Sequence, residues 1–137
     1  MRENDHFRKM LEDFYSFSGM MSQAKGDTWT PPTDVYETET DIVIKMSLPG
    51  LKAEDIGVRF SGDTVLVCGY RGSDEQEKIA SYHQMEIRNG YFQRKVIIHK
   101  PINPEKARAR YDNGFLKIYV PKAERRIEKV VSIRLDL

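Results

Sequence analysis

Apolar residues recur at every second position through most of residues 29–121. Strict alternation is the period of a half-buried β-strand, in which successive side chains point to opposite faces of a sheet. The stretch DIVIKMSL shows it most clearly and ends at Pro49-Gly50, a dipeptide typical of turns. IGVRF and GYFQRKVIIH repeat the pattern, and VLVCGY is a continuous apolar run that indicates a strand covered on both sides. The alternation therefore predicts an all-β fold.

A tight hairpin is predicted near the end of this region. ARARY and FLKIYV alternate in the same way and are joined by Asp112-Asn113-Gly114. Asn-Gly between alternating segments is the strongest short hairpin signal, because a type I′ turn needs positive φ at both central residues. No helical periodicity lies between the strands, so a parallel α/β sheet is not expected. Six or seven short strands separated by turn signals predict a β-sandwich.

Residues 71–90 interrupt the strands with a polar insertion that is long for a loop in a compact domain. Within it, IASYHQMEI carries enough apolar and β-prone residues to form a short strand. A strand on a long connection can reach a second copy of the chain, which is a route to an exchanged dimer. The alternative is a mobile surface loop.

Residues 1–28 form a predicted N-terminal arm. Aromatic residues, leucine and methionine at steps of three and four give it one apolar face of an amphipathic helix. Ser16, Ser18 and Gly19 weaken the pattern, so the arm is predicted to be partly helical or disordered. Two interpretations stand about equally: a helix packed on its own core, or an exposed adhesive arm whose methionines suit many partners. The residues of the apolar face are Phe7, Met10, Leu11, Phe14, Phe17 and Met21.

Residues 122–137 form a C-terminal tail, charged at first and ending in VVSIRLDL. Val131, Ile133, Leu135 and Leu137 place an apolar side chain at every second position, which predicts a strand. A strand there lies beyond the last predicted hairpin. It needs a pairing partner that need not come from its own chain.

The composition argues against several classes of function. The net charge is +1, so no global field attracts nucleic acid or acidic membranes. The longest apolar runs are far too short to cross a bilayer. The first residues mix acids with bases and lack the apolar stretch of a secretion signal, so we expect a cytoplasmic protein. The single Cys68 fits this, because it has no partner for an intrachain disulfide and is expected to be a small buried residue.

No catalytic or metal-binding constellation stands out. The three histidines lack metal-ligand spacing, and neither a nucleophile elbow nor a phosphate loop is present, so no cofactor and no metal is expected. Arg108 and Arg110 share one face of a strand, which we interpret as solvated because acids and bases nearly cancel. Arg94 is in phase with Phe92 and Val96. An arginine on an apolar face needs a carboxylate or carbonyl partner, so we interpret Arg94 as structural.

Several motifs within residues 29–121 agree in order with one known family. They are WTPPTDVYETETDIVIKMSLPGLKAEDIGVRF, then GDTVLVCGYR, then GYFQRKVIIHKPINPEKARARYDNGFLKIYVPKAE. The most specific is A-x-x-x-N-G-[apolar]-L, present as Ala109, Asn113, Gly114 and Leu116, with Phe115 where Val or Ile is usual. Beyond the domain, Val131-Ser132-Ile133 matches a C-terminal I/V-x-I/V tripeptide, and Ile133-Arg134-Leu135 offers a second register. On these residues the chain resembles the α-crystallin domain of the small heat-shock protein family.

The resemblance implies a seven- to eight-stranded immunoglobulin-like sandwich. It also implies an ATP-independent holdase chaperone, not an enzyme, that assembles from dimers into larger oligomers. In the bacterial, archaeal and plant branch, a strand in the long loop pairs with the partner's first domain strand. Here that strand would lie within residues 79–86, its acceptor near residues 33–36, and Arg94 would support the dimer interface. The loop residues expected to form this strand are Ile79, Tyr82, His83 and Met85.

The same resemblance implies that Val131 and Ile133 dock into a groove at the edge of a neighbouring dimer's sandwich. The apolar arm would bind unfolding client proteins. The expected partners are therefore client proteins and other copies of the chain, with no nucleic acid and no membrane. Two alternatives remain open: a co-chaperone-like sandwich that binds one defined partner, and an enzyme on the same scaffold.

Overall fold

The computed structural model describes residues 28–73, 75–124 and 130–136. The apolar face predicted for the N-terminal arm lies outside these residues, so the arm stays a prediction. The residues concerned are Phe7, Met10, Leu11, Phe14, Phe17 and Met21.

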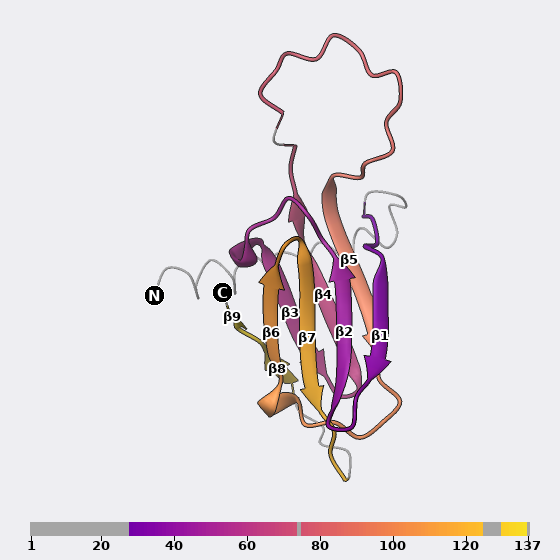
Figure 1. Cartoon of the computed structure of the whole chain (residues 1–137), viewed down its shortest axis with the longest axis vertical. Coiled ribbons are helices and arrows are strands. Elements are labelled where there is room, and N and C mark those ends of the chain that lie inside the picture. The colour runs from indigo at the N-terminus through magenta and orange to yellow at the C-terminus, as the bar shows by residue number, and fades with distance from the viewer. Residues whose placement is uncertain (1–27, 74, 125–129, 137) are drawn as a thin grey trace.

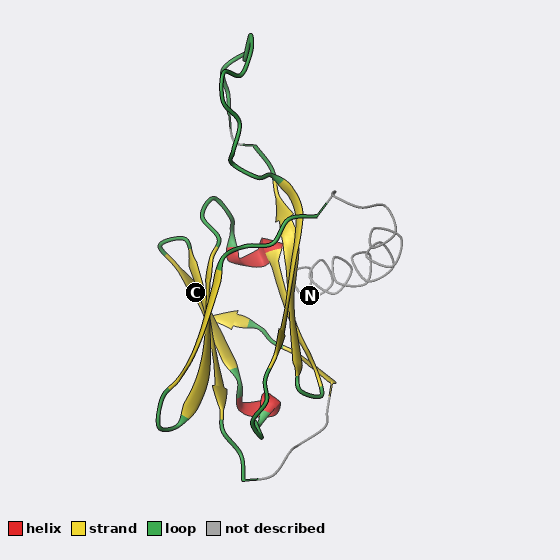
Figure 2. Cartoon of the chain, turned by 90° about the vertical axis from the view of Figure 1, so that its right-hand side faces the viewer, coloured by secondary structure: helices red, strands yellow, loops and turns green. Residues whose placement is uncertain are grey.

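Two β-sheets pack face to face as a sandwich (Figures 1 and 2). The strands are β1 (Thr33–Glu37), β2 (Asp41–Ser47), β3 (Ile56–Ser61), β4 (Thr64–Arg71), β5 (Gly90–Ile97), β6 (Arg108–Asp112), β7 (Phe115–Pro121), β8 (Val130–Ser132) and β9 (Leu135–Asp136), with short 3-10 helices η1 (Ala53–Asp55) and η2 (Pro104–Lys106). One sheet has the order β1-β2-β7-β6-β9 and the other β5-β4-β3-β8. The pairings are antiparallel except for β6 with β9. The predicted all-β sandwich is confirmed.

The core lies between the two sheets and is built from the alternating positions. In β2, Ile42, Ile44 and Met46 point inward and are buried. In β4, residues 65–68 are all buried, as the continuous apolar run predicts. Cys68 belongs to this run, and burial raises the pKa of its thiol to about 12. The thiol therefore stays protonated at neutral pH and behaves as a small apolar side chain.

The predicted Asn-Gly hairpin joins β6 to β7. Asn113 has φ 51° and Gly114 has φ 80°, the positive values that a type I′ turn requires. The Gly114 carbonyl accepts a hydrogen bond of 2.7 Å from the Leu48 N–H, which fixes the turn against the end of β2. The turn sets the register of the whole β6–β7 pair, from Asp112 opposite Phe115 onward.

Gly69 in β4 is a position where no side chain fits. A Cβ there would lie 2.5 Å from the carbonyl oxygen of Asp55 and 2.5 Å from Cζ of buried Phe92. We expect Gly69→Ala to lower the free energy of unfolding by about 3 kcal/mol, because neither neighbour can move without disturbing the core. Gly62→Ala is the control, since Gly62 has φ +60° but nothing within 4 Å of a Cβ. It should cost about 1 kcal/mol, from the left-handed backbone alone. Chemical unfolding at equal protein concentration measures both, and equal losses would contradict the steric argument.

Candidate functional site at the edges of the sandwich

The sandwich has two opposite edges (Figure 1). On one side, β1 and β5 are the last strands of their sheets. On the other side, β6 and β3 are extended by the tail strands β9 and β8. An edge strand leaves backbone N–H and C=O groups unpaired and can accept a further strand. These two edges are therefore the candidate sites for assembly.

The C-terminal tail crosses from one sheet to the other. β8 pairs with β3, with Val131 opposite Phe60 and Ser132 opposite Arg59. The Ile133 N–H donates to the Val58 carbonyl at 3.1 Å. β9 then pairs with β6 in parallel, with Leu135 opposite Ala109. Alternation predicts one terminal strand, whereas the structure has two short ones, β8 and β9, on either side of Ile133 and Arg134. Both pair within the same chain, and Leu137 lies outside the described residues. These partners are β3 and β6, and the linear sequence does not show that they lie beside the tail. We call the surface formed by β3 and β6 the tail-docking edge.

Ile133 is the side chain that anchors the tail. It is 5% exposed and belongs to the core cluster between the sheets. Val131 and Leu135, two residues on either side, are partly buried and pack against the same cluster. The two registers considered from the sequence share Ile133. In this structure Val131 and Leu135 pack against the core as well, so the tail directs three alternate side chains inward, at positions 131, 133 and 135.

The family motif around the hairpin supplies structural positions. Ala109 is fully buried, opposite Leu135 of the tail on one side and Ile118 of β7 on the other. Leu116 is also fully buried in the core. Asn113 and Gly114 provide the turn described above. Each motif residue thus shapes the tail-docking edge or the hairpin that builds it.

Two backbone hydrogen bonds show which groups of β1 face the open edge. The Thr38 N–H donates to the Asp41 carbonyl, and the Ser47 N–H donates to the Pro32 carbonyl. In an antiparallel pair, hydrogen-bonded positions alternate along the strand. The groups of every second residue from 32 to 38 therefore point toward β2. Those of Thr33, Val35 and Glu37 point away from it, toward the open edge.

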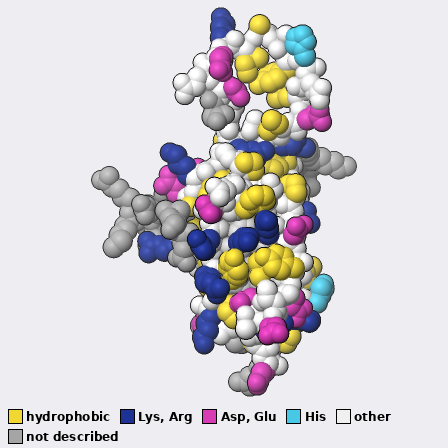
Figure 3. Space-filling view, viewed as in Figure 1, with side chains coloured by type: hydrophobic (Ala, Val, Ile, Leu, Met, Phe, Trp, Pro, Cys, Tyr) yellow, Lys and Arg dark blue, Asp and Glu magenta, His cyan; other side chains and the backbone are white. Residues whose placement is uncertain are grey.

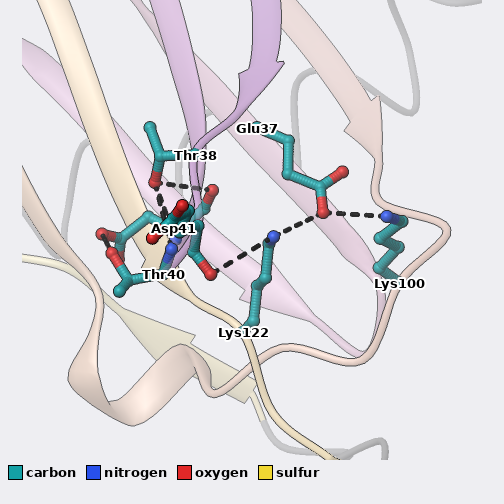
Figure 4. Close-up of polar contacts among 7 residues, drawn as sticks. Glu37, Thr38, Thr40, Asp41, Lys100 and Lys122 are labelled. Atoms are coloured by element: carbon teal, nitrogen blue, oxygen red, sulfur yellow. Dashed lines mark hydrogen bonds and ion pairs between the residues drawn. The ribbon is translucent and has the colours of Figure 1, made fainter.

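An ion cluster fixes the far end of β1 (Figure 4). The Glu37 carboxylate accepts from Lys100 Nζ at 2.8 Å and lies 2.5 Å from Lys122 Nζ. These hydrogen bonds, first from Lys100 and then from Lys122, lower the pKa of Glu37 below its ordinary value. Lys100 follows β5 and Lys122 follows β7, so the cluster ties the edge strand to both sheets. Sequence reasoning missed it, because the three residues are far apart in the chain.

The long loop leaves the sandwich between β4 and β5 and extends away from it (Figure 1). Residues 79–86 form no strand in the single chain. An isolated strand has no neighbour to pair its backbone, so this outcome does not decide what the loop does in a dimer. Its apolar side chains are exposed, Met85 to 67% and Tyr82 to 55%. Ile79 and His83 are also exposed. The proposed intermolecular strand stays a prediction.

Arg71 lies at the neck of this loop and was not singled out from the sequence. Its Nε and Nη2 donate to the Arg88 carbonyl at 3.1 and 2.5 Å, and its Nη1 donates to the Pro49 carbonyl at 3.1 Å. The guanidinium lies over the Trp29 ring, 4.2 Å from its centroid. Trp29 in turn donates from Nε1 to the Gly90 carbonyl at 3.2 Å. One side chain therefore joins both ends of the loop to the start of the domain.

Arg94 occupies the phase predicted for it in β5. Phe92 and Val96 on either side are buried, and Arg94 itself is half-buried opposite Val67. The carboxylate or carbonyl partner expected for it is not found among the side chains and backbone groups that the structure describes. Its proposed support of a dimer interface stays a prediction.

Neither a metal-binding cluster nor a membrane-spanning helix is found among the described residues. Within residues 28–73, 75–124 and 130–136, His, Cys, Asp and Glu form no group of three or more that could hold a metal ion. In the same part of the chain, no helix is long and apolar enough to span a membrane. The features that remain are an open strand edge, an exposed apolar loop and an edge covered by a tail.

Comparisons with known proteins point in one direction. The profile described as "Hsp20/alpha crystallin family" matches residues 34–135. The small heat shock protein C2 of Rickettsia felis is 28% identical over 136 residues, which cover 98% of this chain and 88% of that protein. Among solved structures, HspA of Xanthomonas axonopodis aligns with a TM-score of 0.65 and 26% identity, covering 72% of this chain and 98% of that one. A small heat-shock protein of Xylella fastidiosa aligns with a TM-score of 0.62 and 25% identity, covering 74% and 97%.

Proposed function

The chain belongs to the Hsp20/alpha-crystallin family of small heat-shock chaperones, and from this premise we propose that it is an ATP-independent holdase. It binds unfolding proteins and prevents their aggregation, and it works as an oligomer built from strand-exchanged dimers. The proposal rests mainly on how the tail is bound. Ile133 is buried between the sheets, but the strands β8 and β9 that hold the tail are only three and two residues long. Such a contact can open and close, as a chaperone that exposes adhesive surface on demand requires.

The dimer is proposed to form at the β1 edge. The long loop carries exposed apolar side chains, and β1 offers unpaired backbone groups at Thr33, Val35 and Glu37. Val35 and Tyr36 are themselves exposed to 50% and 42%. A loop strand from a second copy would satisfy the backbone and cover these side chains, which is strand addition at a sheet edge. In a two-fold dimer the exchange occurs twice.

The oligomer is proposed to form through the tail-docking edge. The same β3 and β6 edges are present on every copy, so the tail of a neighbouring dimer can occupy them in place of the chain's own tail. Each buried aliphatic side chain contributes roughly 1.5–3 kcal/mol before ordering costs. One tail contact is therefore weak and reversible, and many contacts within one assembly add up through effective concentration. The Xylella fastidiosa relative is described as having a distinct high order structure, which agrees with this proposal.

We propose that client binding needs neither a covalent bond nor a nucleotide. Unfolding proteins expose apolar surface that aggregates. The predicted arm, which includes Phe14 and Phe17, would bind that surface by burial. Binding an unfolded chain only competes with its aggregation, so release to the native state falls to other chaperones. Clients and other copies of the chain are the proposed partners, and the cytoplasm is the proposed location.

The proposal is tested by heating an aggregation-prone client with increasing amounts of this protein, without ATP, while light scattering is followed. We expect suppression at near-stoichiometric ratios, and none from an equal mass of an unrelated stable protein. A folded protein that suppresses nothing at any ratio would instead favour the co-chaperone-like reading and a search for one defined partner. Turnover abolished by a single His or Asp substitution would revive the enzyme alternative.

Arg71 is expected to set how firmly the loop presents its strand to a partner. Arg71→Ala removes three hydrogen bonds from a charged donor and the stacking on Trp29, so the loop loses its anchor. Both loops of the dimer carry the change, so at roughly 0.5–1 kcal/mol of preorganisation for each loop the dimer dissociation constant should rise about tenfold. Arg88→Ala is the control, because Arg88 contributes its carbonyl to this contact and not its side chain. Native mass spectrometry on dilution measures both variants, and an unchanged Arg71→Ala dimer would exclude the positioning role.

A further inference from the structure

The outer face of the five-stranded sheet carries a row of cations. Lys45 of β2 is in register with Lys117 of β7, and Lys117 is in register with Arg110 of β6. Neighbouring strands lie about 4.8 Å apart, so three positive side chains stand side by side across the sheet. On this face Lys and Arg gather in a band across the middle, with hydrophobic side chains directly beside them (Figure 3).

This row of cations lowers the stability of the sheet, because like charges directly opposite each other on one sheet face are destabilising. Among the side chains that the structure describes, none forms an ion pair with Lys45, Lys117 or Arg110. By register, carboxylate residues stand only at the ends of the row, Asp34 beside Lys45 and Asp136 beside Arg110. The middle of the row is left to an anion from outside.

Aromatic rings lie beneath two cations of this face, one of which, Lys45, belongs to the row. Lys45 Nζ lies 4.4 Å from the centroid of the Phe115 ring, and Arg108 Cζ lies 4.6 Å from that of Tyr119. A cation over a ring face is held in position while its outward N–H groups stay free to donate. Lys45, Lys117 and Arg110 line a pocket of about 250 Å³, in which Asp112 is the one carboxylate among the lining residues. The pocket is therefore positive, and its Lys45 cation is held over a ring.

We propose that this face binds carboxylate-rich segments of unfolding polypeptides, so that the chaperone takes acidic client segments as well as apolar ones. The inference rests on the proposed holdase function and names a class of client for it. Two observations favour a polypeptide over single-stranded nucleic acid. Nucleic acid needs free ring faces for base stacking, and on this face the Phe115 and Tyr119 rings carry cations. Phe115 and Tyr36 of the same face are each 42% exposed, which suits segments where Asp or Glu stands next to apolar residues.

The test uses the full chain and three fluorescein-labelled probes. The first is a soluble twelve-residue peptide with six Glu among Ala, Tyr and Gly, the second replaces every Glu by Gln, and the third is a twelve-nucleotide oligouridine. Anisotropy should show the Glu peptide binding about tenfold or more tightly than the Gln peptide, with the affinity falling as salt is raised. Arg110→Glu with Lys117→Glu should weaken the Glu peptide about tenfold or more. Arg110→Gln with Lys117→Gln should weaken it less.

A matched control separates this face from net charge. Lys95 and Lys106 are exposed cations away from the row, so Lys95→Glu with Lys106→Glu makes the same change in charge and should leave peptide binding unchanged. The proposal is overturned if the Gln peptide binds equally well, if the two charge-reversal pairs behave alike, or if oligouridine binds more tightly than the Glu peptide. Suppression of a near-neutral client should survive Lys45→Glu with Lys117→Glu, because β2 and β7 lie outside the tail-docking edge. If the unmodified protein suppresses aggregation but does not bind the Glu peptide more tightly than the Gln peptide, this inference alone is lost. If no form suppresses any client, the holdase proposal is lost.

Discussion

Replacing Val131 and Ile133 together by alanine is expected to release the tail and reduce the assembly to dimers. Ile133 is buried in the core cluster and Val131 packs against it. Truncating two such side chains removes roughly 3 kcal/mol or more of apolar burial from each docking contact. A contact that is weak to begin with does not survive this loss, and because every subunit carries the change, all contacts of the assembly fail together. Size-exclusion chromatography with multi-angle light scattering measures the result.

The tail also offers its own control. Ser132 and Arg134 alternate with the anchors and are exposed, so Ser132→Ala with Arg134→Ala should leave the assembly at wild-type size. Leu135→Ala tests the register: as a partly buried flank of Ile133, it should loosen the assembly less than the anchor pair does. An assembly that keeps its full mass with both anchors truncated would show that other surfaces, and not the tail-docking edge, hold the dimers together.

The sheets could be predicted because each core strand has its own pattern of apolar residues in the sequence. The alternation in β2 and the unbroken apolar run of β4 are local, and burial follows them residue by residue. The turn at Asn113-Gly114 is also local, since positive φ at both positions needs these residue types. None of these features depends on contacts between distant parts of the chain, so the fold class could be predicted from short stretches of sequence.

The contacts that position the candidate sites could not be predicted in the same way. Glu37 meets Lys100 and Lys122 only because two sheets bring the ends of three strands together. Arg71 reaches Arg88, Pro49 and Trp29 only at the neck of the loop. The tail finds β3 and β6 because the sandwich leaves both edges open. Long-range pairing of charged or backbone groups leaves no periodic signature in a sequence, so these features needed the three-dimensional structure.

Val35→Pro is expected to weaken the dimer strongly at the open edge of β1. The backbone N–H and C=O of Val35 point away from β2, as the bonds at Thr38 and Ser47 imply. Val35→Pro therefore deletes a donor from the open edge without breaking the β1–β2 ladder, and the proline ring projects where a partner strand would lie. A two-fold exchange uses this edge twice, so the loss counts twice. At one to two kcal/mol for each edge, the dimer dissociation constant should rise by about a hundredfold.

Two further variants separate the loss of the Val35 N–H from the loss of the Val35 side chain and from the general effect of a proline in β1. Val35→Ala keeps the N–H and should leave the dimer nearly intact, although it removes part of a half-exposed side chain. Tyr36→Pro deletes a donor that faces β2, so it should lower the thermal stability of the sandwich itself, whereas Val35→Pro should lower it little. Sedimentation on dilution and thermal unfolding together read out the three variants. Because alternation along β1 makes adjacent residues face opposite ways, a Val35→Pro protein that stays folded and stays dimeric would place the dimer contact somewhere other than this edge.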